Sequence, residues 1–225
     1  MAKVYFHTFG CKVNQYETEA LREKLLSRGF EPAADIKTCD LAVVNSCSVT
    51  AEADRKCRQF VRKILRANQT SRIVVTGCYA TRDPQSLKAI SPRIELFSNQ
   101  EKEIIPASVS GCSLLSGESG ILNFFAGHTR AFIKVQDGCD APCTYCIIPK
   151  VRPQMTSRTI PEILKEVQSL LQAGYKEIVL TGIRLGSYGL TSSGGRVGKN
   201  HGALPSLLRE IVAVEGNFRV RLSSL

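Results

Sequence analysis

Tryptophan is absent from this 225-residue chain, and aromatic residues make up only 7% of it. An extensive surface for stacking on bases is therefore not expected. The sequence also has no run of about 18 apolar residues, so it offers no transmembrane helix. Its first ten residues lack the basic start and apolar centre of a signal peptide. We therefore expect a cytoplasmic protein with no membrane partner.

Acidic residues are the minority among the charged ones. The chain has 20 Asp and Glu against 30 Lys and Arg, which gives a formal net charge of +10. Such a surplus favours polyanionic partners, because each neutralised phosphate releases counterions. Charge alone is only an indication, since basic proteins that bind no nucleic acid also exist.

The first hundred residues alternate strand and helix patterns. We expect strands at 3–8, 41–44 and 72–76, and helices from Asn14, from Thr50 to about Ala67, and around 85–90. Asn14 is predicted to cap its helix, with Glu17 three residues later. This alternation predicts an α/β domain over residues 1–105, with helices on both faces of a parallel sheet.

A stretch rich in Ser and Gly, residues 106–127, is expected to be a linker. A second series follows, with strands at 131–136, 177–181 and 218–223 and helices at 159–173 and 204–214. Thr159 and Glu162 form a capping box at the start of the first of these helices. The units in 128–225 make less than half of a (β/α) barrel, and the strand at 218–223 would have an unpaired edge. We therefore expect a fragment of a longer protein that ends in an incomplete barrel domain.

Nine cysteines are many for such a chain, and their odd number without a secretory signal argues against a disulfide framework. Cys139, Cys143 and Cys146 follow a predicted strand with the spacing Cys-x3-Cys-x2-Cys. Three thiolates on one loop can hold three corners of a [4Fe–4S] cluster. The open iron can chelate S-adenosylmethionine. A zinc site is the alternative, but it typically has four ligands with paired spacing.

This triad, with Tyr145 before its last cysteine, resembles the signature of the radical S-adenosylmethionine superfamily. The resemblance implies that the cluster splits the cofactor into a radical and that Tyr145 lies near the adenine. Gly182 and Gly186 follow a strand on the side where barrel active sites lie, and they could let the backbone approach S-adenosylmethionine. A simple turn explains these two glycines nearly as well.

Cys11, Cys47 and Cys78 each follow a predicted strand of the first domain. The carboxyl ends of parallel strands share one edge, which is where such domains bind ligands, so we expect these thiols to meet in space. Chance burial of three unrelated cysteines is the alternative. Cys57 is expected to pack in the core.

The two triads together resemble the methylthiotransferase family. The resemblance runs from residue 3 to the last residue, and the matching motifs are Gly10–Glu17, Gln136–Cys139, Cys146–Pro149 and Thr181–Gly189. It implies a flavodoxin-like first domain with a second [4Fe–4S] cluster on Cys11, Cys47 and Cys78, followed by part of a radical S-adenosylmethionine barrel. The opening motif is most similar to the branch that acts on N6-threonylcarbamoyladenosine in tRNA.

The family resemblance also implies a reaction and its partners. One S-adenosylmethionine supplies a methyl group to sulfur held at the first cluster, a second is cleaved to a radical, and a methylthio group ends on C2 of the adenine at position 37 of tRNA. The electron donor would be a flavodoxin or ferredoxin. The alternatives are the same chemistry on a ribosomal protein, and a truncated cluster-binding fragment without activity.

Some features depart from the family or carry no assignment. Pro153 stands where the family commonly has Gly, and proline restricts the backbone at that position. Cys39 and Cys112 have no partner motif and are given no role. A stripe of arginines on the second predicted helix is either a phosphate-contacting surface or, as we rank first, a solvated face; it comprises Arg55, Arg58, Arg62 and Arg66.

Overall fold

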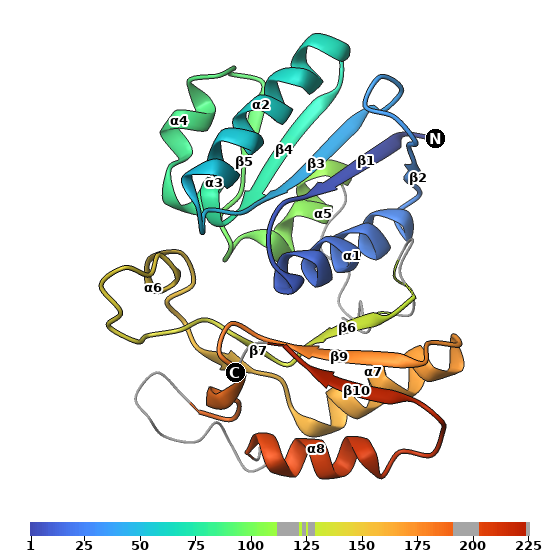
Figure 1. Ribbon diagram of the computed structural model, residues 1–225. Helices are drawn as coiled ribbons and strands as arrows, with labels where there is room; N and C mark the ends of the chain where they lie inside the picture. The colour runs from blue at the N-terminus through green and yellow to red at the C-terminus, as the bar shows by residue number, and fades with distance from the viewer. Residues whose placement is uncertain (112–121, 123–124, 126–128, 191–202, 224–225) are drawn as a thin grey trace. The chain divides into compact units, whose positions relative to one another are not determined.

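The computed structural model describes residues 1–111, 122, 125, 129–190 and 203–223. The chain divides into two compact units, Met1–Glu118 and Ser119–Leu225, which we call unit 1 and unit 2 (Figure 1). Cys112 lies outside the described residues, as does most of the predicted linker. Within the described ranges, no helix has the length and apolar character needed to cross a bilayer.

Unit 1 contains a five-stranded sheet in the order β2-β1-β3-β4-β5, and every neighbouring pair is parallel. β3 is buried along its whole length, as expected for a central strand covered on both faces. The predicted α/β fold class is therefore confirmed. The strands are β1 (Lys3–Thr8), β2 (Glu31–Pro32), β3 (Leu41–Ser46), β4 (Arg72–Gly77) and β5 (Ile94–Leu96).

Helices cover both faces of this sheet (Figure 1). Alternate residues of β3 point to opposite faces, because the side-chain period of a strand is two. Val44 packs in one core with Cys57 of α2, whereas Val43 packs in the other with Leu25 of α1. The elements are α1 (Lys12–Leu26), α2 (Ala51–Ala67), α3 (Cys78–Arg82), α4 (Pro84–Lys88), η1 (Lys102–Ile104) and α5 (Ile105–Ser110).

Unit 2 contains a three-stranded parallel sheet in the order β10-β9-β6 and a two-stranded antiparallel pair, β7 with β8. The helix α7 packs against β6 and against α8 (Figure 1). The elements are β6 (Ala131–Lys134), β7 (Gln136–Asp137), α6 (Ile148–Val151), β8 (Thr156–Ser157), α7 (Ile160–Gln172), β9 (Glu177–Thr181), η2 (Leu185–Ser187), α8 (Leu204–Val212) and β10 (Arg219–Leu222).

The predicted N-caps of two helices can be compared with the structure. Thr159 caps α7, and its capping box with Glu162 is present as predicted. Asn14 was wrongly predicted as a cap: α1 begins at Lys12 after Cys11, and Asn14 lies inside the helix with its side chain fully buried. Asn14 stands three residues after the N-cap Cys11, and its amide donates to the carbonyls of Phe9 and Ser46 instead of capping α1.

The predicted linker and the strand predicted at 131–136 differ in part from the structure, whereas the last predicted strand is present as β10. Residues 106–110 are helical, because α5 buries Ile105, Pro106 and Val109 against unit 1. The strand expected at 131–136 is divided into β6 and β7, and β7 pairs with β8 rather than with the sheet. Among the described strands, β10 pairs with β9 alone.

Candidate functional site

The structure brings Cys11, Cys47 and Cys78 to the carboxyl edge of the sheet of unit 1. Cys11 precedes α1, Cys47 directly follows β3, and Cys78 begins α3 directly after β4. Burial raises the pKa of the Cys47 thiol, and negative charge on Cys78 and Cys11 raises it further, so Cys47 lies within electrostatic range of both other thiols. Cys11 is exposed, whereas Cys47 and Cys78 are buried.

Two glycines make room for this gathering of loops. Gly10 has φ +99°, and a Cβ there would lie 2.6 Å from Cys47 Sγ. Gly77 has φ +97°, and its Cβ would lie 2.3 Å from the carbonyl oxygen of Ser46. Both the left-handed backbone and the close contact require glycine. The loops before Cys11 and Cys78 can therefore approach the loop of Cys47 only because these positions lack a side chain.

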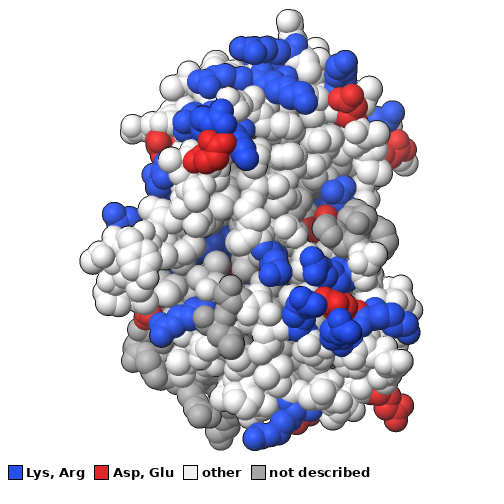
Figure 2. Space-filling view, in the orientation of Figure 1, with Lys and Arg blue, Asp and Glu red and all other residues white. Residues whose placement is uncertain are grey.

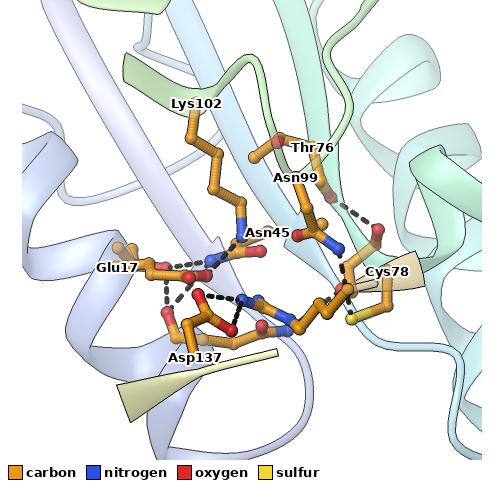
Figure 3. A network of polar contacts seen from close by, with 12 residues as sticks. Glu17, Asn45, Thr76, Cys78, Asn99, Lys102 and Asp137 are labelled. Carbon is orange, nitrogen blue, oxygen red and sulfur yellow. Dashed lines mark hydrogen bonds and ion pairs between the residues drawn. The ribbon is translucent and has the colours of Figure 1, made fainter. Parts of the chain in front are cut away.

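A polar side chain contacts one of these thiols, and two arginines contact the residue that follows it. Asn99 Nδ2 donates a hydrogen bond to Cys78 Sγ at 3.6 Å (Figure 3). Arg82 lies over the ring of Tyr79, the residue after Cys78, with its guanidinium carbon 5.4 Å from the ring centroid. Arg58 donates to the hydroxyl of Tyr79 at 2.7 Å. A hydrogen bond to sulfur, such as that from Asn99, stabilises a thiolate or a cluster held by it, whereas the two arginines contact Tyr79.

A buried ion pair lies in the same unit, between Glu17 of α1 and Lys102 of η1 (Figure 3). Both side chains are only 8% exposed. Removing one partner of such a pair leaves an uncompensated buried charge, which costs about 3–5 kcal/mol. The pair fixes η1 against the helix that follows Cys11.

In unit 2, a loop between β7 and α6 carries Cys139, Cys143 and Cys146. The Cys139 N–H donates to the carbonyl of Arg152 at 3.0 Å, and the Cys146 N–H donates to the carbonyl of Cys143 at 3.1 Å. The Cys143 residue is exposed, and the other two are partly buried. The loop therefore presents its thiols at a surface of unit 2 while its two ends are held.

The start of this loop is fixed by Asp137 and Gly138. The Arg152 guanidinium, whose side chain is 3% exposed, bonds both carboxylate oxygens of Asp137 at 2.8 and 2.7 Å. Gly138 has φ +77°, and a Cβ there would lie 1.9 Å from the carbonyl oxygen of Gln154. The chain beyond Pro153 thus passes against Gly138, so the departure at Pro153 falls where the backbone is tightly packed.

Gln136 links this loop to the glycine-rich segment after β9. Its Nε2 donates to the carbonyls of Asp137 and Gly138 at 2.8 and 2.7 Å, and its Oε1 accepts from the Arg184 N–H at 2.8 Å. A Cβ on Gly182 would lie 3.1 Å from Gln136 Cβ. The motifs Gln136–Cys139 and Thr181–Gly189, which are distant in the sequence, are therefore in direct contact in unit 2.

The remaining predicted cofactor residues are accessible. Tyr145 is 90% exposed, so its ring is not packed against the described residues of unit 2. A Cβ on Gly186 would meet nothing within 4 Å, and Gly186 lines a small pocket with Tyr188, Gly189 and Leu204. A side chain at Gly182 would crowd Gln136 and Leu185, whereas Gly186 borders open space.

Both triads consist of thiols, the donors that iron–sulfur clusters take. Among the described residues, no three His, Cys, Asp or Glu side chains converge closely enough to hold one metal ion. Each triad supplies three of the four thiolates that a [4Fe–4S] cluster commonly takes. Cys39 and Cys57 are buried among core residues, consistent with packing.

Comparison with known proteins adds to these observations. Residues 3–99 match the family described as "Uncharacterized protein family UPF0004". A solved structure of the radical S-adenosylmethionine methyltransferase TsrM from Kitasatospora setae has the same fold, with a TM-score of 0.61 over 98% of this chain and 54% of its own, at 17% identity. The fold is thus that of an α/β protein with radical S-adenosylmethionine enzymes as structural neighbours.

Two relatives bear the name "Threonylcarbamoyladenosine tRNA methylthiotransferase MtaB". The protein from Bacillus subtilis is 39% identical over 100% of this chain and 52% of its own length, and that from Chlamydia pneumoniae is 38% identical over 96% and 49%. The chain is therefore a homologue of the MtaB methylthiotransferases, which confirms the predicted resemblance. It spans about half the length of the relatives that it matches.

Proposed function

We propose that the chain is part of a methylthiotransferase that adds a methylthio group to C2 of N6-threonylcarbamoyladenosine at position 37 of tRNA. The observation that carries this proposal is the presence of two separate cysteine triads, one on the sheet edge of unit 1 and one on the loop of unit 2. The names of the relatives supply the substrate. The opening motif at Gly10–Glu17 favours this branch over one acting on a ribosomal protein.

Each triad would hold one [4Fe–4S] cluster: Cys11, Cys47 and Cys78 the first, and the triad of unit 2 the second. When bound, the second cluster would supply the electron that cleaves S-adenosylmethionine, and the first would hold sulfur for transfer. The chain's own residues bind and orient these groups. In unit 1, Asn99 donates a hydrogen bond to Cys78 Sγ.

In unit 2, Arg152 and Gln136 fix the loop that presents the thiols. Tyr145, Gly182 and Gly186 are the residues proposed to lie near S-adenosylmethionine. The open space at Gly186 and the exposure of Tyr145 leave both accessible to a cofactor. A flavodoxin or ferredoxin would supply the electrons.

The positive charge of the chain supports a tRNA substrate. Figure 2 shows more Lys and Arg than Asp and Glu on the face drawn. On α2, Arg55 is paired with Glu52 and Arg58 with Tyr79, whereas among the described residues Arg62 has no acidic partner within ion-pair distance. In the predicted arginine stripe, Arg55 and Arg58 thus already have partners inside unit 1. Arg62 and Arg66 are the members that we expect to contact phosphates.

Mass spectrometry of tRNA nucleosides tests this function directly. A strain that lacks the gene should lose 2-methylthio-N6-threonylcarbamoyladenosine, and the gene in its full genomic extent should restore it. Unchanged nucleosides together with loss of a methylthio group from a ribosomal protein would support the other substrate. Restoration by the long gene but not by these 225 residues would identify the chain as an inactive cluster-binding part.

A further inference from the structure

Two buried polar side chains connect the three loops that carry Cys11, Cys47 and Cys78. Asn14 lies in α1 and Ser46 ends β3, and both residues are 0% exposed. A polar group is retained in such a position when it is fully hydrogen-bonded, because an unbonded one would be costly. The partners of these two side chains are therefore informative.

Asn14 joins the loop of Cys11 to the loop of Cys47. Its Nδ2 donates to the carbonyl of Phe9 at 2.9 Å and to the carbonyl of Ser46 at 3.0 Å. Phe9 lies two residues before Cys11, and Ser46 lies directly before Cys47. One side chain thus uses both of its donors on the backbone that leads into two different thiols.

Ser46 joins the loop of Cys47 to the loop of Cys78. Its hydroxyl donates to the carbonyl of Thr76 at 2.5 Å and accepts from the Ala80 N–H at 3.2 Å. Thr76 and Ala80 stand two residues before and two residues after Cys78. The single hydroxyl therefore spans the turn in which Cys78 lies.

We propose that Asn14 and Ser46 are positioning residues that lock the three thiol-bearing loops together before any cluster binds, so that unit 1 presents a preformed site. Asn14 fixes the first loop to the second, and Ser46 fixes the second to the third. Buried hydrogen bonds of this kind favour one arrangement over others. The proposal rests on the proposed function only for the identity of the group that the thiols would hold.

Asn68 provides a matched control at the opposite edge of the same sheet. It is also buried, and its Nδ2 donates to the carbonyls of Ile36, Lys37 and Cys39, the last at 2.8 Å. Its replacement by alanine removes the same kind of buried amide without touching a thiol-bearing loop. A merely structural effect should therefore appear equally in both asparagine variants.

Hydrogen exchange of the metal-free, reduced chain, followed by mass spectrometry, tests whether Asn14 and Ser46 hold the thiol-bearing loops together. Asn14→Ala should raise exchange about tenfold at residues 9–11 and 46–48, and Ser46→Ala should do so at 46–48 and 77–81. Asn68→Ala should raise exchange near residues 36–40 and leave the thiol loops unchanged. Asn14→Asp, whose carboxylate form cannot donate, should act as Asn14→Ala does. If Asn14→Ala does not fold, Ser46→Ala carries the same test.

Equal exchange of the thiol loops in the parent and both variants would overturn the proposal, as would an equal effect of Asn68→Ala on these loops.

Iron uptake gives a second readout. With Cys143→Ala disabling the second triad, anaerobic reconstitution with iron and sulfide should give about four irons per chain. Asn14→Ala and Ser46→Ala should reduce this by more than half, and Asn68→Ala should not. A parent that takes up no iron would refute the first cluster, while the exchange result would still decide the lock.

Discussion

Gly138→Ala is the substitution whose effect on the second triad can be worked out most directly. The residue has φ +77°, and an L-residue in the left-handed region costs roughly 1–2 kcal/mol. The added Cβ would lie 1.9 Å from the carbonyl oxygen of Gln154, a backbone atom that cannot rotate away. Relieving such an overlap by backbone shifts costs about 1–3 kcal/mol more. We expect a loss of about 2–5 kcal/mol in the free energy of unfolding.

Gly174→Ala separates the two contributions. Gly174 has φ +94°, but a Cβ there would meet nothing within 4 Å, so this variant should show only the backbone cost. Urea unfolding of both variants, followed by far-UV circular dichroism, measures the difference, which we expect to be about 1–3 kcal/mol. Equal unfolding free energies would refute the overlap at Gly138. Reduced iron binding by Gly138→Ala, with normal binding by Gly174→Ala, would tie the overlap to the thiol loop.

Three further predictions concern the thiols. Cys143→Ala should abolish reductive cleavage of S-adenosylmethionine in the full-length protein, whereas Cys47→Ala should spare it and block methylthio transfer; equal loss of cleavage in both folded variants would contradict separate roles. Gly10→Ala places a Cβ 2.5 Å from Cys47 Cβ, so iron after reconstitution should fall from about eight toward about four per chain, and unchanged iron would oppose this. Burial raises the pKa of Cys57 to about 12. The buried, protonated Cys57 thiol therefore contributes its full stabilisation below about pH 8.5, the pKa of an unfolded thiol. This stabilisation is lost as the pH rises through about 12. Iodoacetamide at about pH 8.5 should therefore label exposed Cys143 and spare native Cys57, as peptide mass spectrometry would show.

Sequence patterns predicted the regular elements well where local chemistry and the hydrophobic pattern agreed. The capping box at Thr159 and the apolar face of α7 define one helix within a residue at each end. The strand predictions for 3–8 and 177–181 match β1 and β9 because both are continuous runs favoured in strands. Placing Cys47 and Cys78 after adjacent parallel strands also predicted that they would meet at one sheet edge.

What local patterns missed were polar residues whose partners lie far away in the sequence. Asn14 matched a capping pattern, but its amide bonds a carbonyl 32 positions later. The pairing of Arg152 with Asp137 and the contact of Gln136 with Arg184 likewise depend on the folded loop. One available signal was that Gln136 stands next to an acid–glycine–cysteine run, where a side chain able to bond several carbonyls is useful.

The two triads differ in how their thiols are brought together. Cys139, Cys143 and Cys146 lie within one loop, so the chain entropy lost in gathering them is small. Cys11 and Cys78 belong to different strand ends, and they approach one another only after β1, β3 and β4 have paired in register. The local triad can therefore be gathered without strand pairing, whereas the dispersed triad exists only once the sheet of unit 1 has formed. Iron binding by Cys11, Cys47 and Cys78 would for that reason also indicate that the sheet of unit 1 has folded.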